Sequence, residues 1–510
     1  MCTGLAHANP VVIQDLKDGL VLGPYLHIFE DKEGIAKWED VIAGKHDAEF
    51  KAQNKAVPNF GSTRSVIWAV VDLEFTPPPA PPHYVERGAR DSTIPSPRSG
   101  EGHAQAARGE GYLLELSHPI LDYVDVWVLD AKGKILQSWQ TGDLRPFDSR
   151  PIKHRNFLFP LSALTGARIF IRISTESSLS IPMNIWPKST FAEKDMEATL
   201  FLGIYYGIIF VMVLYNLITA YAFKSLSGYL YVGYMFFLLL FQTMLDGIFY
   251  QAFPGLQYWN NLGITFWGNF SVAFGAWFAI QYLQIRGPMP KLTLALFIVG
   301  SIALLGALIT PFFGYRFGSI INRFFGGTTG PFLLIVAGIW RYRQGYRPAK
   351  YFLAGYGILA ISVIIYTLGR FGLFPSANFL VYHAMHFGSA LEAILLSFGL
   401  ADRIRLIQKE KELAQAATIE QQRILNEAFA RFVPAPFLQI LGKNSIPEVL
   451  LGDYTEREMT ILFADIRGFT TISEGLEPND LLLFARVADE GSFSRAAERA
   501  GMPKSSVSRR

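Results

Sequence analysis

Two histidines and a glutamate near residue 390 have residue types and a spacing that could do chemistry. His383 and His386 share one face of an expected helix, and Glu392 lies about two turns further along. Ionisable groups inside a membrane are costly and usually face the interior of a helix bundle. The trio allows a metal or proton site, or hydrogen bonds between helices, and we expect the hydrogen bonds. Other ionisable residues in or near the apolar stretches are Asp246, Arg323 and Arg370.

A second group of chemical residues lies near the end of the chain, where Asp465 follows the apolar run 459–464. The stretch ILFADIRGFT, with Phe432-Val433-Pro434 and Gly452-Asp453 before it, resembles the opening of a class III adenylate/guanylate cyclase domain. The resemblance covers residues 431–478. It implies a partial α/β cyclase domain over that range.

The cyclase resemblance carries expectations about individual residues. Enzymes of this family use two divalent ions to clamp the attacking and leaving oxygens. The resemblance implies that Asp465 and the backbone carbonyl of Ile466 bind Mg²⁺ or Mn²⁺. It also implies that Gly468, Phe469 and Thr470 bind the nucleotide phosphates. The region that should supply the second metal ligand is foreign to the family, so we expect that ligand to be missing, the active site to be incomplete and this chain to be inactive.

The foreign region, residues 480–510, resembles the start of a LysR-type helix-turn-helix regulator. The stretch SFSRAAERAG is typical of that family, and we expect Ser492 to cap the first helix and Gly501 to make the turn. The resemblance implies that the following residues face DNA phosphates and base edges: Lys504, Ser505, Ser506, Ser508 and Arg509. One incomplete motif should bind DNA weakly, so an inert basic extension is favoured over a working DNA reader.

The composition indicates a membrane protein with soluble parts. Half of the 510 residues are hydrophobic, 17% are charged and the formal net charge is +3, so charge alone does not suggest a nucleic-acid partner. Seven apolar stretches lie within residues 199–401, each about long enough to cross a bilayer. Basic residues concentrate in alternate loops, for example at Arg341, Arg343 and Arg347. This asymmetry predicts a multi-pass protein of the inner (plasma) membrane with its N-terminus outside and its C-terminus in the cytoplasm.

The segment 11–190 shows the alternation of strands and turns that is typical of a β-sandwich. Together with the membrane region it resembles the 7TM receptors with diverse intracellular signalling modules (7TMR-DISM), on stretches such as Leu121-Asp122-Tyr123-Val124-Asp125. The resemblance implies a jelly-roll-like extracytoplasmic sensory domain and an unidentified small-molecule or carbohydrate ligand. Three tryptophans could stack on sugars, but we expect them in the core: Trp68, Trp127 and Trp139. Residues 77–111 are expected to be a disordered insertion.

Residues 402–430 are charged and helix-prone, and they predict either a signalling helix that forms a homodimer or a solvated connector. Ala6-His7-Ala8 suggests the end of a signal peptide whose earlier part is lost, or a chance match. Three hypotheses for the whole remain open. The chain is a receptor for cyclic nucleotide (cAMP/cGMP) signalling whose cyclase part is truncated, a membrane-tethered transcription regulator, or an artefactual fusion of two genes.

Overall fold

The computed structural model describes residues 10–13, 16, 18–75, 111–161, 167–370, 379–430, 435–444, 448–456, 458, 474–475 and 478–503. Several predictions concern residues outside these ranges. They are the expected signal-peptide remnant Ala6–Ala8, nearly all of the expected insertion 77–111, and the predicted cyclase and DNA-contacting residues. Residues 412–510 form a compact unit distinct from residues 1–411.

The N-terminal domain is a β-sandwich, as predicted. Its larger sheet has the order β4-β3-β6-β11-β8-β9, and β1 pairs with β6 in parallel. These strands are β1 (Val11–Ile13), β3 (His27–Asp31), β4 (Lys51–Ala52), β6 (Val66–Phe75), β8 (Tyr123–Asp130), β9 (Ile135–Thr141) and β11 (Ala167–Ser174). The second sheet has the order β10-β7-β13-β2, formed by β2 (Leu20–Val21), β7 (Tyr112–Leu116), β10 (Phe157–Leu161) and β13 (Met183–Pro187). A separate pair joins β5 (Asn59–Ser62) to β12 (Ser178–Ser180).

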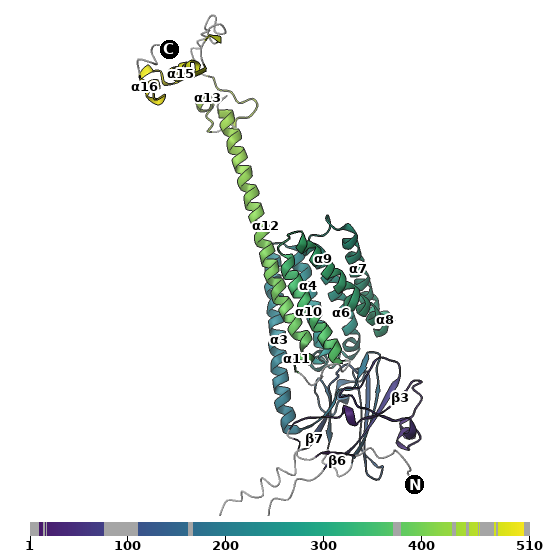
Figure 1. Ribbon diagram of the computed structural model, residues 1–510. Helices are drawn as coiled ribbons and strands as arrows, with labels where there is room; N and C mark the ends of the chain where they lie inside the picture. Colours follow the sequence, from purple (N-terminus) through teal and green to yellow (C-terminus); the bar gives the residue numbers. More distant parts are fainter. Residues whose placement is uncertain are drawn as a thin grey trace, which may run out of the picture. The chain divides into compact units, whose positions relative to one another are not determined.

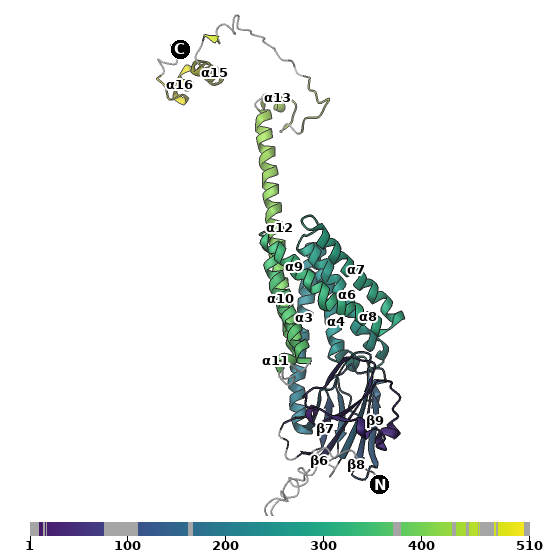
Figure 2. The ribbon, with the colours of Figure 1, turned by 45° about the vertical axis from the view of Figure 1, so that its right-hand side comes forward.

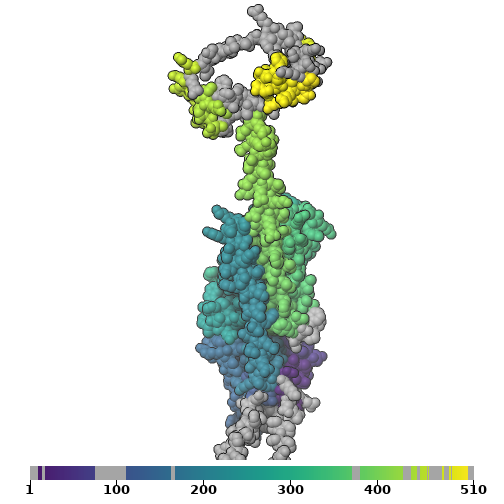
Figure 3. Space-filling view, turned by 90° about the vertical axis from the view of Figure 1, so that its left-hand side faces the viewer, coloured from purple at the N-terminus to yellow at the C-terminus, as the bar shows by residue number. Residues whose placement is uncertain are grey.

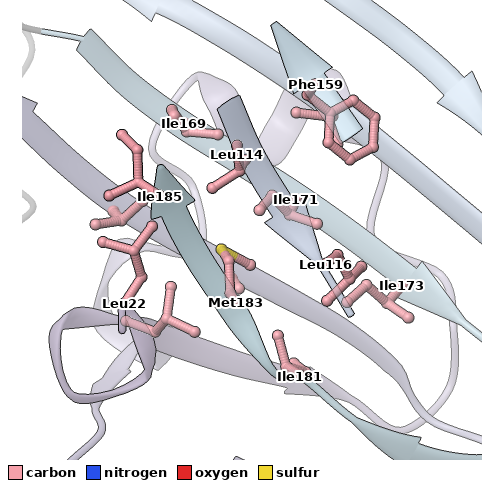
Figure 4. Packing of buried hydrophobic residues seen from close by; sticks show 14 of the residues in the cluster. Leu22, Leu114, Leu116, Phe159, Ile169, Ile171, Ile173, Ile181, Met183 and Ile185 are labelled. Atoms are coloured by element: carbon pink, nitrogen blue, oxygen red, sulfur yellow. The ribbon is translucent and has the colours of Figure 1, made fainter. Parts of the chain in front are cut away.

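The main core lies between the two sheets. Figure 4 shows Leu114, Leu116 and Ile185 of the smaller sheet facing Ile169 and Ile171 of β11. Alternate residues of β13 are buried, which is the period-two pattern of a strand with one face on a core. Strand β11 follows the same pattern except at Phe170, which is buried on the opposite face of the sheet. Strand β8 differs, because six consecutive residues, 124–129, are buried. Both faces of β8 are therefore covered.

The second face of the larger sheet is covered by α1 (Trp38–Ile42) and the loop around the short 3₁₀ helix Asp47–Glu49. Trp68 and Trp127 are buried there, with ring centroids 5.8 Å apart, and Trp38 stacks on Trp127 at 5.9 Å. Trp139 packs at the margin of the main core. The expectation that the three tryptophans are structural is thus met, although two of them lie outside the space between the sheets.

Seven helices are long and apolar enough to cross a membrane within the described ranges, as predicted. They are α3 (Lys188–Ala222), α4 (Leu226–Leu245), α6 (Gln257–Tyr282), α7 (Pro290–Phe313), the segment Tyr315–Arg343, α10 (Ala349–Arg370) and α12 (Ala384–Ala430). Segment Tyr315–Arg343 comprises α8 (Tyr315–Ile321), a π-helical stretch (Asn322–Thr329) and α9 (Gly330–Arg343). Short helices α5 (Ile248–Ala252) and α11 (Phe379–Tyr382) precede α6 and α12.

The sandwich lies at one end of this bundle, next to the N-terminal part of α3 (Figure 1). Helix α6 is the most enclosed, with 67% of its most apolar window buried against 22% for α3. Aromatic rings and small residues fill the bundle interior around Tyr231, Phe278 and Phe352. Figure 3 shows α3 as an outer ridge of the bundle with α12 beside it.

The predicted signalling helix 402–430 is the continuation of α12, which runs without a break from Ala384 to Ala430. The second unit contains α13 (Ala435–Ile440), α15 (Pro478–Glu490) and α16 (Phe493–Arg499). Leu483 and Ala497 form a small core between α15 and α16. Ser492 holds the N-cap position of α16 without a side-chain hydrogen bond, and Gly501 has a positive φ of 63°, as a turn residue needs.

Candidate functional site at the junction of the sandwich and the membrane bundle

Two aspartates converge at the end of the β8–β9 pair that faces the bundle. Asp122 directly precedes β8, and Asp143 is the second residue after β9. The two strands are antiparallel and pair Val124 with Thr141, so these two ends lie side by side. Gly142 makes the approach possible. A Cβ at this position would lie 1.9 Å from the Asp122 carbonyl oxygen, and its φ is 152°. The backbone N–H of Asp143 donates to the Leu121 carbonyl at 2.8 Å, which fixes the two loops together.

Both carboxyl groups are buried, and Asp122 receives a hydrogen bond from the membrane bundle. Asn261 of α6 donates from Nδ2 to Asp122 Oδ1 at 3.0 Å, and the backbone N–H of Glu176 donates to Asp122 Oδ2 at 2.7 Å. Asp143 is 0% exposed, and its carboxyl oxygens make no hydrogen bond of normal geometry within the described residues. Burial, and then the neighbouring Asp122 carboxylate, raise the pKa of Asp143 well above its ordinary value. Burial also raises the pKa of Asp122.

Arg150 provides the counter-charge on the same side of the sandwich. Its Nη1 donates to the carbonyl oxygens of His154 at 2.7 Å and Arg155 at 2.8 Å, which closes the loop that follows it. The guanidinium lies 4.3 Å from the ring centre of Phe157 and 5.4 Å from that of Tyr250 in α5. Burial lowers the pKa of Arg150 to about 10, against the opposing effect of Asp143. The arginine therefore remains a cation in a dry aromatic setting.

Three further contacts join the sandwich to the bundle, at the end where Figure 2 shows the loops meeting the helices. The hydroxyl of Tyr250 donates to the Arg145 carbonyl oxygen. Arg316 pairs with Glu176 across 3.2 Å. Gly247, with φ 72°, packs so closely that a Cβ would lie 2.7 Å from Pro119 and 2.8 Å from the Arg155 carbonyl oxygen.

The residue before this glycine connects the junction to α12. Asp246, the C-cap of α4, accepts hydrogen bonds at Oδ2 from Tyr206 of α3 at 2.5 Å and from His386 of α12 at 2.8 Å. The turn that contacts the sandwich therefore also joins three membrane helices. A displacement of the sandwich against Gly247 would reach α12 through one carboxylate.

Further polar contacts hold α12 in the bundle over its membrane part. Tyr234 donates to Glu392, with 2.8 Å to each carboxylate oxygen. Other pairs are Tyr205–Ser389 at 2.8 Å, Asn216–Ser397 at 2.7 Å and Arg403–Ser227 at 2.6 Å. Hydrogen bonds of this kind between helices position a helix at modest individual energy. The same helix continues without a break to Ala430, so these contacts position the helix that includes the predicted signalling segment 402–430.

The N-terminal part of α3 forms a second connection. Glu115 of β7 accepts hydrogen bonds from Trp186 at 2.9 Å and Lys194 at 2.6 Å. Asp195 pairs with Arg155 at 2.5 Å and with His154 at 3.0 Å. The β-sandwich thus contacts the N-terminal turns of α3, and it also contacts the ends of α4, α5 and α6 that face it.

The predicted sites have mixed outcomes. His386 and Glu392 take part in hydrogen bonds between helices, as expected, whereas His383 lies in the break before α12 and packs on Phe201 with centroids 4.3 Å apart. No cluster of three potential metal-ligating side chains occurs in the described part of the chain. The predicted cyclase residues (Asp465, Ile466, Gly468, Phe469, Thr470) and DNA-contacting residues (Lys504, Ser505, Ser506, Ser508, Arg509) lie outside it.

The junction itself was not predicted as a site. In the sequence, Asp122 stands out only as part of a stretch that resembles the 7TMR-DISM receptors. A charged residue next to a strand is ordinary in a loop, so only the pairing of β8 with β9 reveals that Asp122 and Asp143 approach each other.

Three parts of the chain match models of known protein families. Residues 23–187 match the family model 7TMR-DISM extracellular 2, and residues 198–403 match the model 7TM diverse intracellular signalling. Residues 478–510 match the bacterial regulatory helix-turn-helix protein model of the lysR family.

Two curated adenylate cyclases are similar to short parts of the chain. An adenylate cyclase of Anabaena cylindrica is 41% identical over 58 residues, which is 11% of this chain and 12% of that protein. The terminal-differentiation specific adenylate cyclase of Dictyostelium discoideum is 31% identical over 78 residues, 14% of this chain and 4% of that protein. The chain therefore spans a small fraction of either cyclase.

Proposed function

We propose that this chain, which carries the extracellular and seven-helix domains of the 7TMR-DISM signalling receptors and a LysR-type segment at its end, transmits ligand binding outside the membrane to an output of cyclase lineage. The contacts from Asp122 and Gly247 through Asp246 to α12 carry the proposal, because they join the sandwich to the helix that leaves the bundle. The ligand is a small molecule or carbohydrate, as the resemblance of the sandwich implies.

The orientation belongs to the same proposal. With the sandwich outside, α12 carries Arg403, Arg405 and Lys409 into the cytoplasm, in agreement with the excess of basic residues expected on that side. The inner (plasma) membrane is the location we propose.

The output part is proposed to be catalytically inactive in this chain. Similarity to two adenylate cyclases supports the lineage of the cyclase-like segment. Residues 478–510, which match the helix-turn-helix model, occupy the region where the family supplies its second metal-binding aspartate. One carboxylate, Asp465, cannot hold two ions in the required pair. Cyclic nucleotide formation from Mn²⁺–ATP or Mn²⁺–GTP by the purified full chain, lost in Asp465→Ala, would refute this part.

Homodimerisation through α12 is the proposed form of transmission. Beyond residue 404 the helix presents exposed apolar side chains at intervals, at Ile407, Leu413, Ile419, Ile424 and Leu425. Two parallel copies could bury this surface, although the heptad pattern is irregular.

Disulfide cross-linking tests the transmission without a known ligand. Cys2 is the one cysteine of the sequence, so Cys2→Ser gives a cysteine-free background for a single Leu413→Cys. We expect oxidation to cross-link two copies in membranes. Adding Asn261→Leu, which removes the hydrogen bond to Asp122, should change the cross-linking rate by several-fold, whereas Lys132→Gln on an exposed turn should not. An unchanged rate with Asn261→Leu would contradict the coupling path, and absence of cross-linking would contradict the dimer.

A membrane-tethered DNA reader is the second candidate, favoured by the helix-turn-helix match and by the packing of α15 against α16. We hold it to be the weaker one, since a single short motif supplies few phosphate contacts. Sequence-specific retardation of a palindromic operator at physiological salt, lost in Arg509→Ala, would reverse that order.

A further inference from the structure

Helix α3 is longer than the membrane requires. Its 35 residues span about 52 Å at 1.5 Å per residue, whereas a hydrocarbon core is about 30 Å thick. The surplus lies at its N-terminal end, where Lys194 and Asp195 pair with residues of the sandwich. The first turns of α3 therefore stand at the level of the lipid headgroups or above.

A depression of about 980 Å³ lies between these turns and the sandwich. Its apolar lining comes from both sides, with Leu113, Ile152 and Leu158 on the sandwich and Phe191, Met196 and Leu200 on α3. Met196 is 69% exposed and Leu200 is 66% exposed. Large apolar side chains gathered in an open hollow mark a binding surface more often than ordinary solvent-exposed surface.

Positive charge lines the same hollow. Lys188 makes no ion pair with any described residue, and the amine of Lys153 has one exposed partner, Asp148, at 2.7 Å. The acidic residue in the lining, Asp195, is already paired with Arg155 and His154. The rim therefore has an excess of positive charge above an apolar floor, which complements a molecule with an anionic head and a hydrocarbon tail.

The apolar floor continues into the membrane. Ile204 lines the depression, and Ile208 and Val211 follow it as exposed residues down α3. This surface belongs to the outer ridge that Figure 3 shows along the bundle. Leu113, Leu158 and Phe191 are already buried against one another, so the exposed apolar surface belongs to Met196 and Leu200 on α3. A tail could reach this surface from the bilayer without crossing water, whereas a soluble anion would leave it exposed.

We propose that this depression is a binding site for an anionic phospholipid of the surrounding bilayer. The phosphate lies between Lys153 and Lys188, and an acyl chain covers Met196, Leu200 and Ile204. Because the site touches both the sandwich and α3, the lipid composition of the membrane biases how firmly the two are held together. The proposal concerns the membrane environment and is independent of the output of the receptor.

Quenching by brominated lipids tests the site in the full-length protein. A Cys2→Ser, Met196→Cys chain is labelled with a fluorophore and placed in nanodiscs of phosphatidylcholine containing phosphatidylglycerol, with bromine on the chains of one lipid at a time. We expect brominated phosphatidylglycerol to quench more than brominated phosphatidylcholine. Each lysine near an anionic headgroup contributes about fivefold, so Lys153→Gln with Lys188→Gln should lower the preference about 25-fold.

Matched variants separate this site from general contact with lipid. A label at Phe210→Cys, on the membrane part of α3, should be quenched equally by both lipids, and Lys132→Gln should leave the preference at residue 196 unchanged. Both lysines are exposed, so their replacement should not impair folding. Equal quenching by the two lipids at residue 196, or a preference that survives the double substitution, overturns the proposal. Absence of quenching by either lipid also overturns it and indicates that a second copy covers the depression.

Discussion

Replacing Asp143 by asparagine should make the sandwich more stable at neutral pH. The carboxyl group is fully buried, and burial and the neighbouring Asp122 raise its pKa well above the ordinary 3.8. The native state therefore holds a proton that the unfolded chain releases. The stabilisation is complete below the unfolded pKa and is lost as the pH rises toward the folded pKa. Asparagine keeps the neutral shape and cannot ionise.

The magnitude follows from proton linkage. For each pH unit between the unfolded and folded pKa values, a single group costs about 1.4 kcal/mol of unfolding free energy. The variant should keep only the shallower dependence due to Asp122, whose own pKa is raised by burial. Arg150 lowers the pKa of Asp143 by its positive charge, and so reduces the loss of unfolding free energy expected for the wild type.

Hydrogen–deuterium exchange of β8 provides the assay, because its amides report opening of the sandwich in the intact membrane protein. Opening free energies of peptides within Tyr123–Asp130 are compared in mildly acidic and neutral buffer, with exchange rates corrected for pH. The control is Asp148→Asn, an exposed carboxyl group in the loop after β9. The reasoning is wrong if wild type and Asp143→Asn lose protection equally as the pH rises, or if the control abolishes the loss.

Two further predictions concern the turn after α4. Gly247→Ala should destabilise the junction by about 2 kcal/mol, because alanine disfavours the positive φ of this position and its Cβ would meet Pro119 and the Arg155 carbonyl oxygen. Faster hydrogen–deuterium exchange of the 115–121 peptides would confirm this destabilisation, and unchanged exchange would contradict it. Asp246→Asn and Tyr206→Phe should show a coupling energy of about 1 kcal/mol in a double-mutant cycle of thermal stability, because the two side chains share a hydrogen bond. If the stability losses of the two single variants simply add in the double variant, this contact contributes nothing.

The sequence predicts the large elements well because each has a strong periodic or hydrophobic pattern. The strands at Val66, Tyr112 and Ala167 and all seven apolar helices occur where alternation or apolar length indicates them. The buried position of Trp68 was also expected, but its place beneath α1 was not, since no pattern states which face of a sheet a second layer covers.

The junction could not be derived in the same way. Asn261 and Asp122 are 139 residues apart in the sequence, and Asp122 and Asp143 lie in the loops next to β8 and β9. They meet because β8 and β9 pair and because the sandwich rests on α6. The hydrogen bonding of Glu392 was foreseen in kind, while its partner Tyr234 depends on the rotation of two helices about their axes.

The enclosed position of α6 has a consequence for the synthesis of the protein. The most apolar stretch of α6 has a mean hydropathy of 1.2, the lowest of the seven candidate spans in the described ranges, and the helix buries the amides of Asn260, Asn261 and Asn269. Such a segment partitions poorly into lipid by itself, because each side-chain amide enters hydrocarbon without a partner. Helix α6 should therefore remain at the insertion machinery until α4 and α7 can receive it. Substitutions that make α6 more polar would then reduce the amount of protein in the membrane before they affect the signal it carries.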